Sequence, residues 1–188
     1  MAVEWVVAAG VLVGASALLW GLSAWMTRRI ETTVPINGRF VEVDGERFHY
    51  VEEGKGPPLV MIHGLMGSSR NLTYALSGQL RERFRVITLD RPGSGYSSRG
   101  AHTAADLPAQ ARQIAAFIKT LDLDKPLVLG HSLGGAIALA LALDHPHAVS
   151  GLVLVAPLTH PQRLLPLVFL SLAVRPAWLR RWVSHTLT

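Results

Sequence analysis

Hydrophobic and polar positions alternate in the first part of the sequence that follows the N-terminal segment, and uninterrupted apolar runs come later. Residues 39–43 and 47–52 alternate, and the Asp44-Gly45-Glu46 stretch that joins them is typical of a β-hairpin. The later runs are largely apolar, as expected of strands buried on both faces of a sheet, and they cover residues 59–62, 84–89, 125–129 and 149–156. The pattern therefore predicts six strands.

Helical spacing of apolar residues marks the segments between the later strands. One helix is expected to begin near residue 71, capped by Ser68 or Ser69. A second follows Thr103-Ala104-Ala105-Asp106, which we interpret as a capping box with Asp in place of Glu and which leads a helix to about residue 121. A third ends near Asp144. Buried strands that alternate with helices predict an α/β fold with a mostly parallel sheet.

An unbroken apolar segment precedes all of these elements. Residues 6–26 contain no charged side chain over 21 positions, and a helix of that length spans about 31 Å, close to the hydrocarbon core of a bilayer. Trp5 and Trp25 stand near its ends, where indole rings favour the membrane interface. We expect a single transmembrane helix, with a cleaved signal peptide as the alternative. Arg28 and Arg29 favour a cytoplasmic position for the domain that follows.

Composition narrows the possible functions. The chain has 188 residues and a net charge of +5, but its basic residues are scattered, and we expect no nucleic-acid partner. It has no cysteine, which excludes disulfides, thiolate metal ligands and a cysteine nucleophile. Its eight histidines show no metal-binding spacing, so we expect neither a metal nor another cofactor.

The sequence Gly130-His131-Ser132-Leu133-Gly134, called the elbow below, lies between a predicted strand and a predicted helix. That context favours a nucleophile elbow, in which a sharp turn exposes the serine hydroxyl. Glycines at both ends remove the Cβ atoms that would collide in such a turn. The hydroxyl would lie at a helix N-terminus, where the helix dipole favours negative charge.

Three separated motifs together resemble the α/β-hydrolase superfamily, in the branch that includes esterases and lipases. They are His63-Gly64-Leu65 after the third strand, the glycine-rich loop of residues 90–97 (DRPGSGYS) after the fourth, and the elbow after the fifth. Each follows a buried strand, at the sheet edge where ligands bind in α/β proteins. The resemblance covers residues 36–160 and implies about six of the family's eight strands.

The resemblance implies a role for each matching residue. Ser132 corresponds to the nucleophile, and the backbone N–H groups of Leu133 and Leu65 correspond to the oxyanion-hole donors, with Met66 as the alternative to Leu65. Structural roles are expected for three other motif residues. His63 should shape the oxyanion loop, Asp90 should order the glycine-rich loop, and His131 should pack within the elbow.

The resemblance leaves the partners of the serine unassigned. The family order is Ser, then Asp or Glu, then His, yet residues 145–188 contain no acidic residue. His160 follows the sixth strand and His185 lies near the end of the sequence, and both are weak substitutes for the base. His145 and His147 should lie away from the hydroxyl, at the far end of the helix that leaves the elbow.

We therefore expect a truncated enzyme with a membrane anchor at residues 1–30, the first part of a hydrolase core at 31–160 and the beginning of a helical lid at 161–188. Its predicted function is hydrolysis of a small-molecule ester or lipid through an acyl-enzyme on Ser132. A non-catalytic membrane protein that uses the same fold as a binding module is the alternative, and a nonfunctional truncation product with an unpaired sixth strand is a third.

Overall fold

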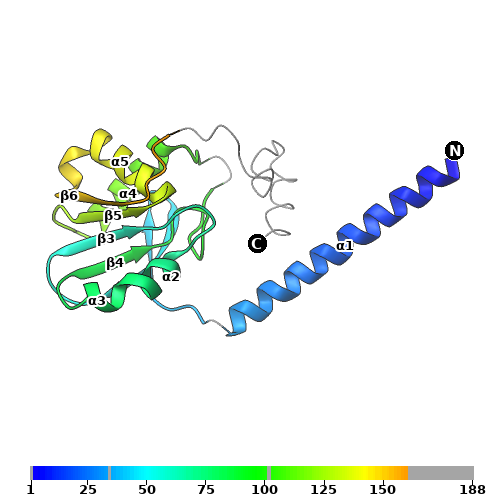
Figure 1. Ribbon diagram of the computed structural model, residues 1–188, viewed down its shortest axis with the longest axis horizontal. Helices are drawn as coiled ribbons and strands as arrows, with labels where there is room; N and C mark the ends of the chain where they lie inside the picture. Colours follow the sequence, from blue (N-terminus) through cyan, green and yellow to red (C-terminus); the bar gives the residue numbers. More distant parts are fainter. Residues whose placement is uncertain (1, 34, 101–102, 161–188) are drawn as a thin grey trace. The chain divides into compact units, whose positions relative to one another are not determined.

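The computed structural model describes residues 2–33, 35–100 and 103–160, and the part of the chain before residue 37 forms a unit separate from residues 37–161. Helix α1 (Ala2–Thr33) makes up most of the first unit (Figure 1). Within it, Gly10–Arg29 is long and apolar enough to cross a membrane, with a mean hydropathy of 1.4, and an N-terminal signal sequence can share these properties. The predicted lid at 161–188 and His185 lie outside the described residues.

A six-stranded sheet organises the second unit, in the order β1-β2-β4-β3-β5-β6. The strands are β1 (Arg39–Val43), β2 (Glu46–Glu53), β3 (Pro58–Ile62), β4 (Arg85–Leu89), β5 (Leu127–His131) and β6 (Gly151–Val155). β4, β3, β5 and β6 run parallel to one another, whereas β2 pairs antiparallel with both β1 and β4. The predicted α/β class and mostly parallel sheet are confirmed.

The hairpin between β1 and β2 turns at the expected place. Asp44 and Gly45 form a two-residue turn with φ values of 50° and 79°, and Val43 pairs with Glu46 across it. Positive φ at both turn positions matches the right-handed twist of the strands, which is why Asp-Gly suits this turn.

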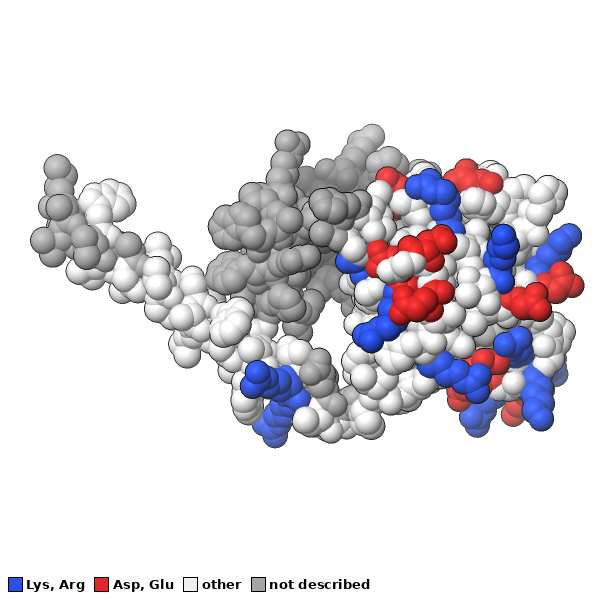
Figure 2. Space-filling view, turned by 180° about the vertical axis from the view of Figure 1, so that it is seen from behind, with Lys and Arg blue, Asp and Glu red and all other residues white. Residues whose placement is uncertain are grey.

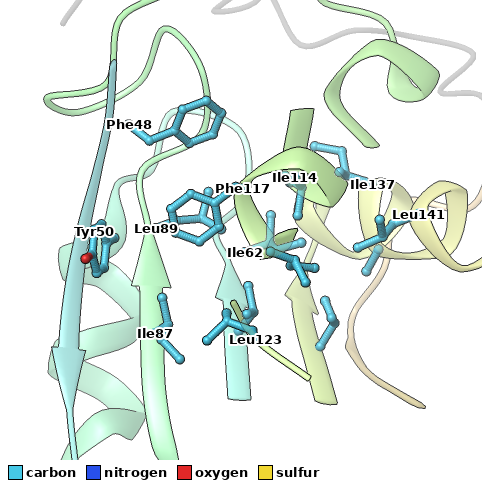
Figure 3. Close-up of a cluster of buried hydrophobic side chains, with 14 of the residues drawn as sticks. Phe48, Tyr50, Ile62, Ile87, Leu89, Ile114, Phe117, Leu123, Ile137 and Leu141 are labelled. Carbon is cyan, nitrogen blue, oxygen red and sulfur yellow. The ribbon is translucent and has the colours of Figure 1, made fainter. Parts of the chain in front are cut away.

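Helices cover both faces of the sheet. They are α2 (Ser69–Leu72), the π-helical turn η1 (Thr73–Ser77), α3 (Gly78–Leu80), α4 (Leu107–Thr120), α5 (Leu133–Asp144) and the 3-10 turn η2 (Pro146–Ala148). On one face, apolar side chains of α4 and α5 pack against Val60 and Ile62 of β3 (Figure 3). On the other face, Leu72 packs with Leu59 and Met61. Neighbouring β3 side chains therefore enter opposite layers, which explains why the strand is apolar throughout.

The capping-box prediction at Thr103–Asp106 is wrong. Asp106 itself caps α4, and its Oδ1 accepts the N–H of Ala109 at 2.8 Å. The Thr103 hydroxyl donates instead to Oε1 of Glu46 at 2.7 Å, because a carboxylate is available across the loop. The other predicted cap is confirmed, since Ser68 has the extended backbone of an N-cap and its N–H donates to Asn71 Oδ1 at 2.8 Å.

Strand β6 forms the end of the sheet in the part of the chain that the structure describes. Its Val153, Leu154 and Val155 are each partly exposed. An apolar edge of this kind was expected from the sequence, and it is a surface that another strand could cover. On the face of the molecule shown in Figure 2, acidic and basic side chains lie interspersed.

Candidate active site

The elbow has the strained geometry that its sequence predicts. Ser132 connects the end of β5 to the first residue of α5, with φ 53° and ψ −117°. A residue with a Cβ atom rarely adopts a positive φ, and the strain costs about 1–3 kcal/mol. Backbone bonds on both sides hold it: the Ser132 N–H donates to the Val155 carbonyl at 3.0 Å, and the Ser132 carbonyl accepts the Leu158 N–H at 2.9 Å.

Glycines allow neighbouring backbone segments to approach the elbow closely. A Cβ at Gly130 would lie 2.6 Å from the Cα of Gly135, and one at Gly134 would lie 2.6 Å from the carbonyl oxygen of His63. A Cβ at Gly64 would lie only 3.1 Å from the Cβ of Ser132. The oxyanion loop, residues 63–67, therefore lies directly against the candidate nucleophile.

The predicted oxyanion-hole donors come from the two segments that meet here. Leu133 is the first residue of α5, where N–H groups have no acceptor within the helix. Leu65 follows Gly64 in the oxyanion loop, and its side chain is 37% exposed. Met66, the alternative donor, has a φ of 55° and a side chain that is 61% exposed. The donor roles of Leu65 and Leu133 stay predictions.

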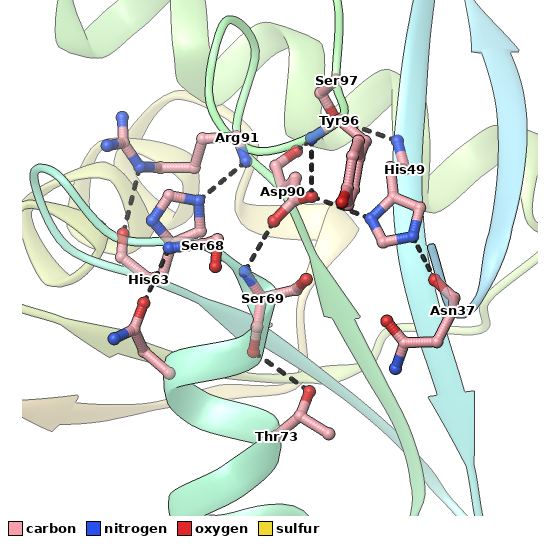
Figure 4. Close-up of polar contacts among 11 residues, drawn as sticks. Asn37, His49, His63, Ser68, Ser69, Thr73, Asp90, Arg91, Tyr96 and Ser97 are labelled. Atoms are coloured by element: carbon pink, nitrogen blue, oxygen red, sulfur yellow. Dashed lines mark hydrogen bonds and ion pairs between the residues drawn. The ribbon is translucent and has the colours of Figure 1, made fainter. Parts of the chain in front are cut away.

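The imidazole of His63 is buried and both of its nitrogens are engaged. Its Nε2 accepts the N–H of Arg91 at 3.0 Å (Figure 4). Nδ1 therefore carries the proton, and it donates to the Gly64 carbonyl at 2.8 Å. Burial, reinforced by the charge of Arg91, lowers the pKa of His63 to about 4. A neutral ring with no free nitrogen suits the structural role expected of His63.

Acid should destabilise the protein through this histidine. The pKa of His63 is lowered from 6.5 to about 4 in the folded domain. Between these pH values, His63 is protonated in the unfolded chain and neutral in the folded domain. The resulting contribution of His63 to the free energy of unfolding is fully present above pH 6.5. It is lost as the pH falls toward 4, and the loss amounts to about 3 kcal/mol. Urea unfolding followed by far-UV circular dichroism across this range measures it. The variant His63→Asn does not titrate there, and a slope as steep as that of the wild type in this variant would contradict the assignment.

Asp90 follows β4 and is 1% exposed. Its Oδ1 accepts the N–H of Ser69 at 2.6 Å, and its Oδ2 accepts the N–H of Tyr96 at 3.0 Å (Figure 4). One carboxylate thus joins the first residue of α2 to the glycine-rich loop. These contacts fit the ordering role expected of Asp90.

Sequence reasoning missed His49 in β2. Its Nδ1 lies 2.8 Å from Oδ2 of Asp90, and its Nε2 contacts the Asn37 carbonyl. The alternating pattern of 47–52 suggested one exposed face, yet Phe48 and His49 are both buried. The ring of Phe48 packs against Phe117 of α4 with ring centroids 5.4 Å apart, and the ring of His49 packs against Tyr96 of the glycine-rich loop at 5.3 Å. These contacts join segments that lie far apart in the sequence, so the alternating pattern could not reveal them.

The described histidines do not supply an evident base. No hydrogen bond joins a histidine to the Ser132 hydroxyl within residues 2–33, 35–100 and 103–160. His145 and His147 follow the far end of α5, as expected. His160 lies two residues after Leu158, which contacts the elbow, and its Nδ1 is 3.0 Å from the Thr159 hydroxyl.

Two further possibilities concern His131 and a metal site. His131 is exposed in the elbow, and its Nδ1 would lie 3.2 Å from a Cβ at Gly64, which places its ring against the oxyanion loop. Among the described residues, no group of three or more His, Asp or Glu side chains could hold a metal ion.

Comparison with known proteins identifies the family of this fold. The sequence matches the alpha/beta hydrolase fold family over residues 57–187. The chain belongs to that family. Haloalkane dehalogenase 2 of Mycobacterium tuberculosis is 36% identical over 123 residues, which are 64% of this chain and 42% of that protein. The chain therefore spans less than half the length of this curated relative.

Solved structures of hydrolases have the same fold. A membrane phospholipase A, described as a bacterial virulence factor, superposes with a TM-score of 0.63 and 30% identity over 92% of this chain and 55% of that one. Est816, an enzyme that degrades N-acyl homoserine lactones, has a TM-score of 0.58 and 30% identity over 63% of this chain and 45% of its own.

Proposed function

We propose that the protein is a membrane-anchored serine hydrolase that cleaves carboxylic esters or lipids through an acyl-enzyme on Ser132. The observation that carries the proposal is the contact between two family motifs: the strained Ser132 lies against Gly64, so the hydroxyl and the N–H of Leu65 belong to one site. The N–H of Leu133, at the start of α5, comes from the elbow itself. In this proposal the two N–H groups serve as the oxyanion donors, and acyl transfer requires such donors beside a reactive hydroxyl.

The reaction follows from these groups. The Ser132 oxygen attacks the ester carbonyl and gives its proton to a general base, which we place outside the described residues. The carbonyl oxygen becomes an oxyanion held by Leu65 and Leu133, and each such donor is typically worth about 2.7–4 kcal/mol. The alcohol then leaves with the proton, and water releases the acid from the acyl-enzyme.

Chemistry favours an ester over an alkyl halide, the substrate class named for one relative. A serine oxygen that displaced a halide would form an alkyl ether. Water does not cleave such an ether near neutral pH, so the enzyme would stop after one turnover. An acyl-serine is an ester, which water can hydrolyse in the same site. Exposed apolar side chains near the elbow, Leu65, Met66 and Leu158, would suit an acyl chain.

Labelling with a fluorophosphonate tests the proposal, because this probe reacts only with an activated serine. We expect the full-length gene product, which must supply the general base, to be labelled on the peptide that contains Ser132, and its Ser132→Ala variant to lose labelling by at least about a thousandfold. Ser150→Ala is the matched control, since Ser150 is exposed and lies away from the elbow, and it should label normally.

The alternative is a non-catalytic membrane protein that uses the fold for binding. It is favoured by the lack of a histidine bonded to the Ser132 hydroxyl among the described residues. A folded protein that takes up no probe at Ser132 would support this alternative and contradict the proposed hydrolase.

A further inference from the structure

Arg91 is a buried cation whose side-chain hydrogen bonds within the described residues all go to uncharged acceptors. It is the second residue after β4, and it is 5% exposed. Its Nε donates to the His63 carbonyl at 3.1 Å, Nη2 to the Gly64 carbonyl at 3.0 Å, and Nη1 to Oε1 of Gln110 at 2.8 Å. Burial, and then the charge of Arg99, lowers the pKa of Arg91 to about 10, so it remains a cation at neutral pH.

A charge taken out of water without a carboxylate partner is costly to the fold. This free-energy cost of burying Arg91 suggests that its contacts do more than pack the interior. Two of its three side-chain bonds go to consecutive carbonyls of the oxyanion loop, and its own N–H binds the His63 ring (Figure 4). The loop that carries the candidate donor is therefore held at several points by one residue.

Peptide geometry connects these bonds to the N–H of Leu65. The carbonyl of Gly64 and the N–H of Leu65 belong to the same peptide unit, and in a trans peptide they point in opposite directions. Two donors, Nη2 of Arg91 and Nδ1 of His63, fix the direction of the Gly64 carbonyl. Fixing that oxygen on one side fixes the direction of the Leu65 N–H on the other.

We propose that Arg91 is a positioning residue for the oxyanion hole: by binding the carbonyls of His63 and Gly64, it holds the N–H of Leu65 in the direction needed to receive the developing oxyanion. The inference rests on the proposed hydrolase function. A cation on the Gly64 oxygen also polarises the peptide and makes its N–H a stronger donor. The planar fork of a guanidinium reaches two neighbouring carbonyls at once, which a lysine ammonium does not match.

The variants Arg91→Lys and Arg91→Met test this role. Lysine keeps the charge but loses the fork, and methionine removes every polar contact of the side chain while filling much of its volume. Arg85→Lys is the matched control, because Arg85 stands at the opposite end of β4 and pairs with Glu52 at 2.7 Å. Circular dichroism of each variant, before and during heating, establishes that it is folded at the assay temperature.

For a p-nitrophenyl ester we expect Arg91→Lys to lower kcat between tenfold and a hundredfold with KM changed less than twofold, since the oxyanion exists only after attack. Arg91→Met should lose at least as much, and Arg85→Lys should stay within twofold of the wild type. A merely structural role predicts parallel losses of stability and of active protein, with kcat per labelled site unchanged. That result would overturn the proposal.

A second measurement keeps the positioning role separate from the proposed function. The amide resonance of Leu65 in a ¹H–¹⁵N spectrum reports the hydrogen bonding of its own peptide unit, whether or not Ser132 reacts. We expect Arg91→Lys to move that resonance and Arg85→Lys to leave it in place. If the wild type shows no reactivity at Ser132 while the Leu65 resonance moves, the hydrolase fails and the positioning survives. If the resonance does not move in either Arg91 variant, the positioning fails.

Discussion

Replacing Asp90 with asparagine should lower the free energy of unfolding by about 3–5 kcal/mol, the loss expected when one partner of a buried charged network is removed. The carboxylate accepts the N–H groups of Ser69 and Tyr96, one on each oxygen, and its Oδ2 also lies 2.8 Å from Nδ1 of His49. An asparagine amide must turn its NH₂ toward one of these donors, and that donor is then left unpaired in a site that solvent does not reach.

Urea unfolding followed by far-UV circular dichroism measures this effect. Tryptophan fluorescence would not report it, because all five tryptophans lie at positions 5, 20, 25, 178 and 182, outside the domain of residues 37–161. Asp124→Asn is the matched control, since Asp124 is exposed and surface substitutions usually change stability by less than about 0.5 kcal/mol. A loss below about 1 kcal/mol for Asp90→Asn would show that the carboxylate is not the organising group described here.

The elbow and the sheet could be predicted because they depend on local signals. The continuous apolar run of β3 reflects burial on both faces, the Asp-Gly turn fixes the hairpin register, and the glycines at 130 and 134 announce a tight approach. Each signal lies within a few residues of the structure it determines. The positive φ of Ser132 follows from the same short stretch.

The polar interior could not be predicted, because it depends on which strands become neighbours. His49 contacts Asp90 across 41 positions of sequence, since β2 pairs with β4. Arg91 contacts His63 across 28 positions, since β3 and β4 are parallel neighbours and their carboxyl ends meet. In the sequence both residues look like ordinary solvated side chains of a strand and a loop. Neither the order of the strands along the chain nor the composition predicts that β4 pairs with both β2 and β3.

The pairing of β3 with β4 also explains why the glycine-rich loop and the oxyanion loop contact each other. Asp90 orders the glycine-rich loop, whereas the next residue, Arg91, reaches the oxyanion loop. His63 contacts both, through the Arg91 N–H and the Gly64 carbonyl. A change in one loop is therefore expected to reach the other through residues 90 and 91, without any direct contact between their tips.

The substitution Gly134→Ala should destabilise the domain by about 3 kcal/mol or more, the upper part of the range for overpacking a buried site. A Cβ at this position would collide with the carbonyl of Ile62 and lie 2.6 Å from that of His63. Both obstacles are backbone atoms at the end of β3, so no side-chain rotation can relieve them. Either α5 must move away from the sheet, or the oxyanion loop must shift from Ser132.

Gly78→Ala is the matched control for this change. Gly78 is also helical, but a Cβ there meets nothing within 4 Å, and alanine favours a helix over glycine by about 0.5–1 kcal/mol. We expect Gly78→Ala to be neutral or stabilising in the same urea experiment, while Gly134→Ala unfolds at a lower concentration. Equal midpoints for the two variants would contradict the close packing of α5 on β3. That packing brings the start of α5 to the oxyanion loop, so a folded Gly134→Ala protein should also lose fluorophosphonate labelling more steeply than it loses stability.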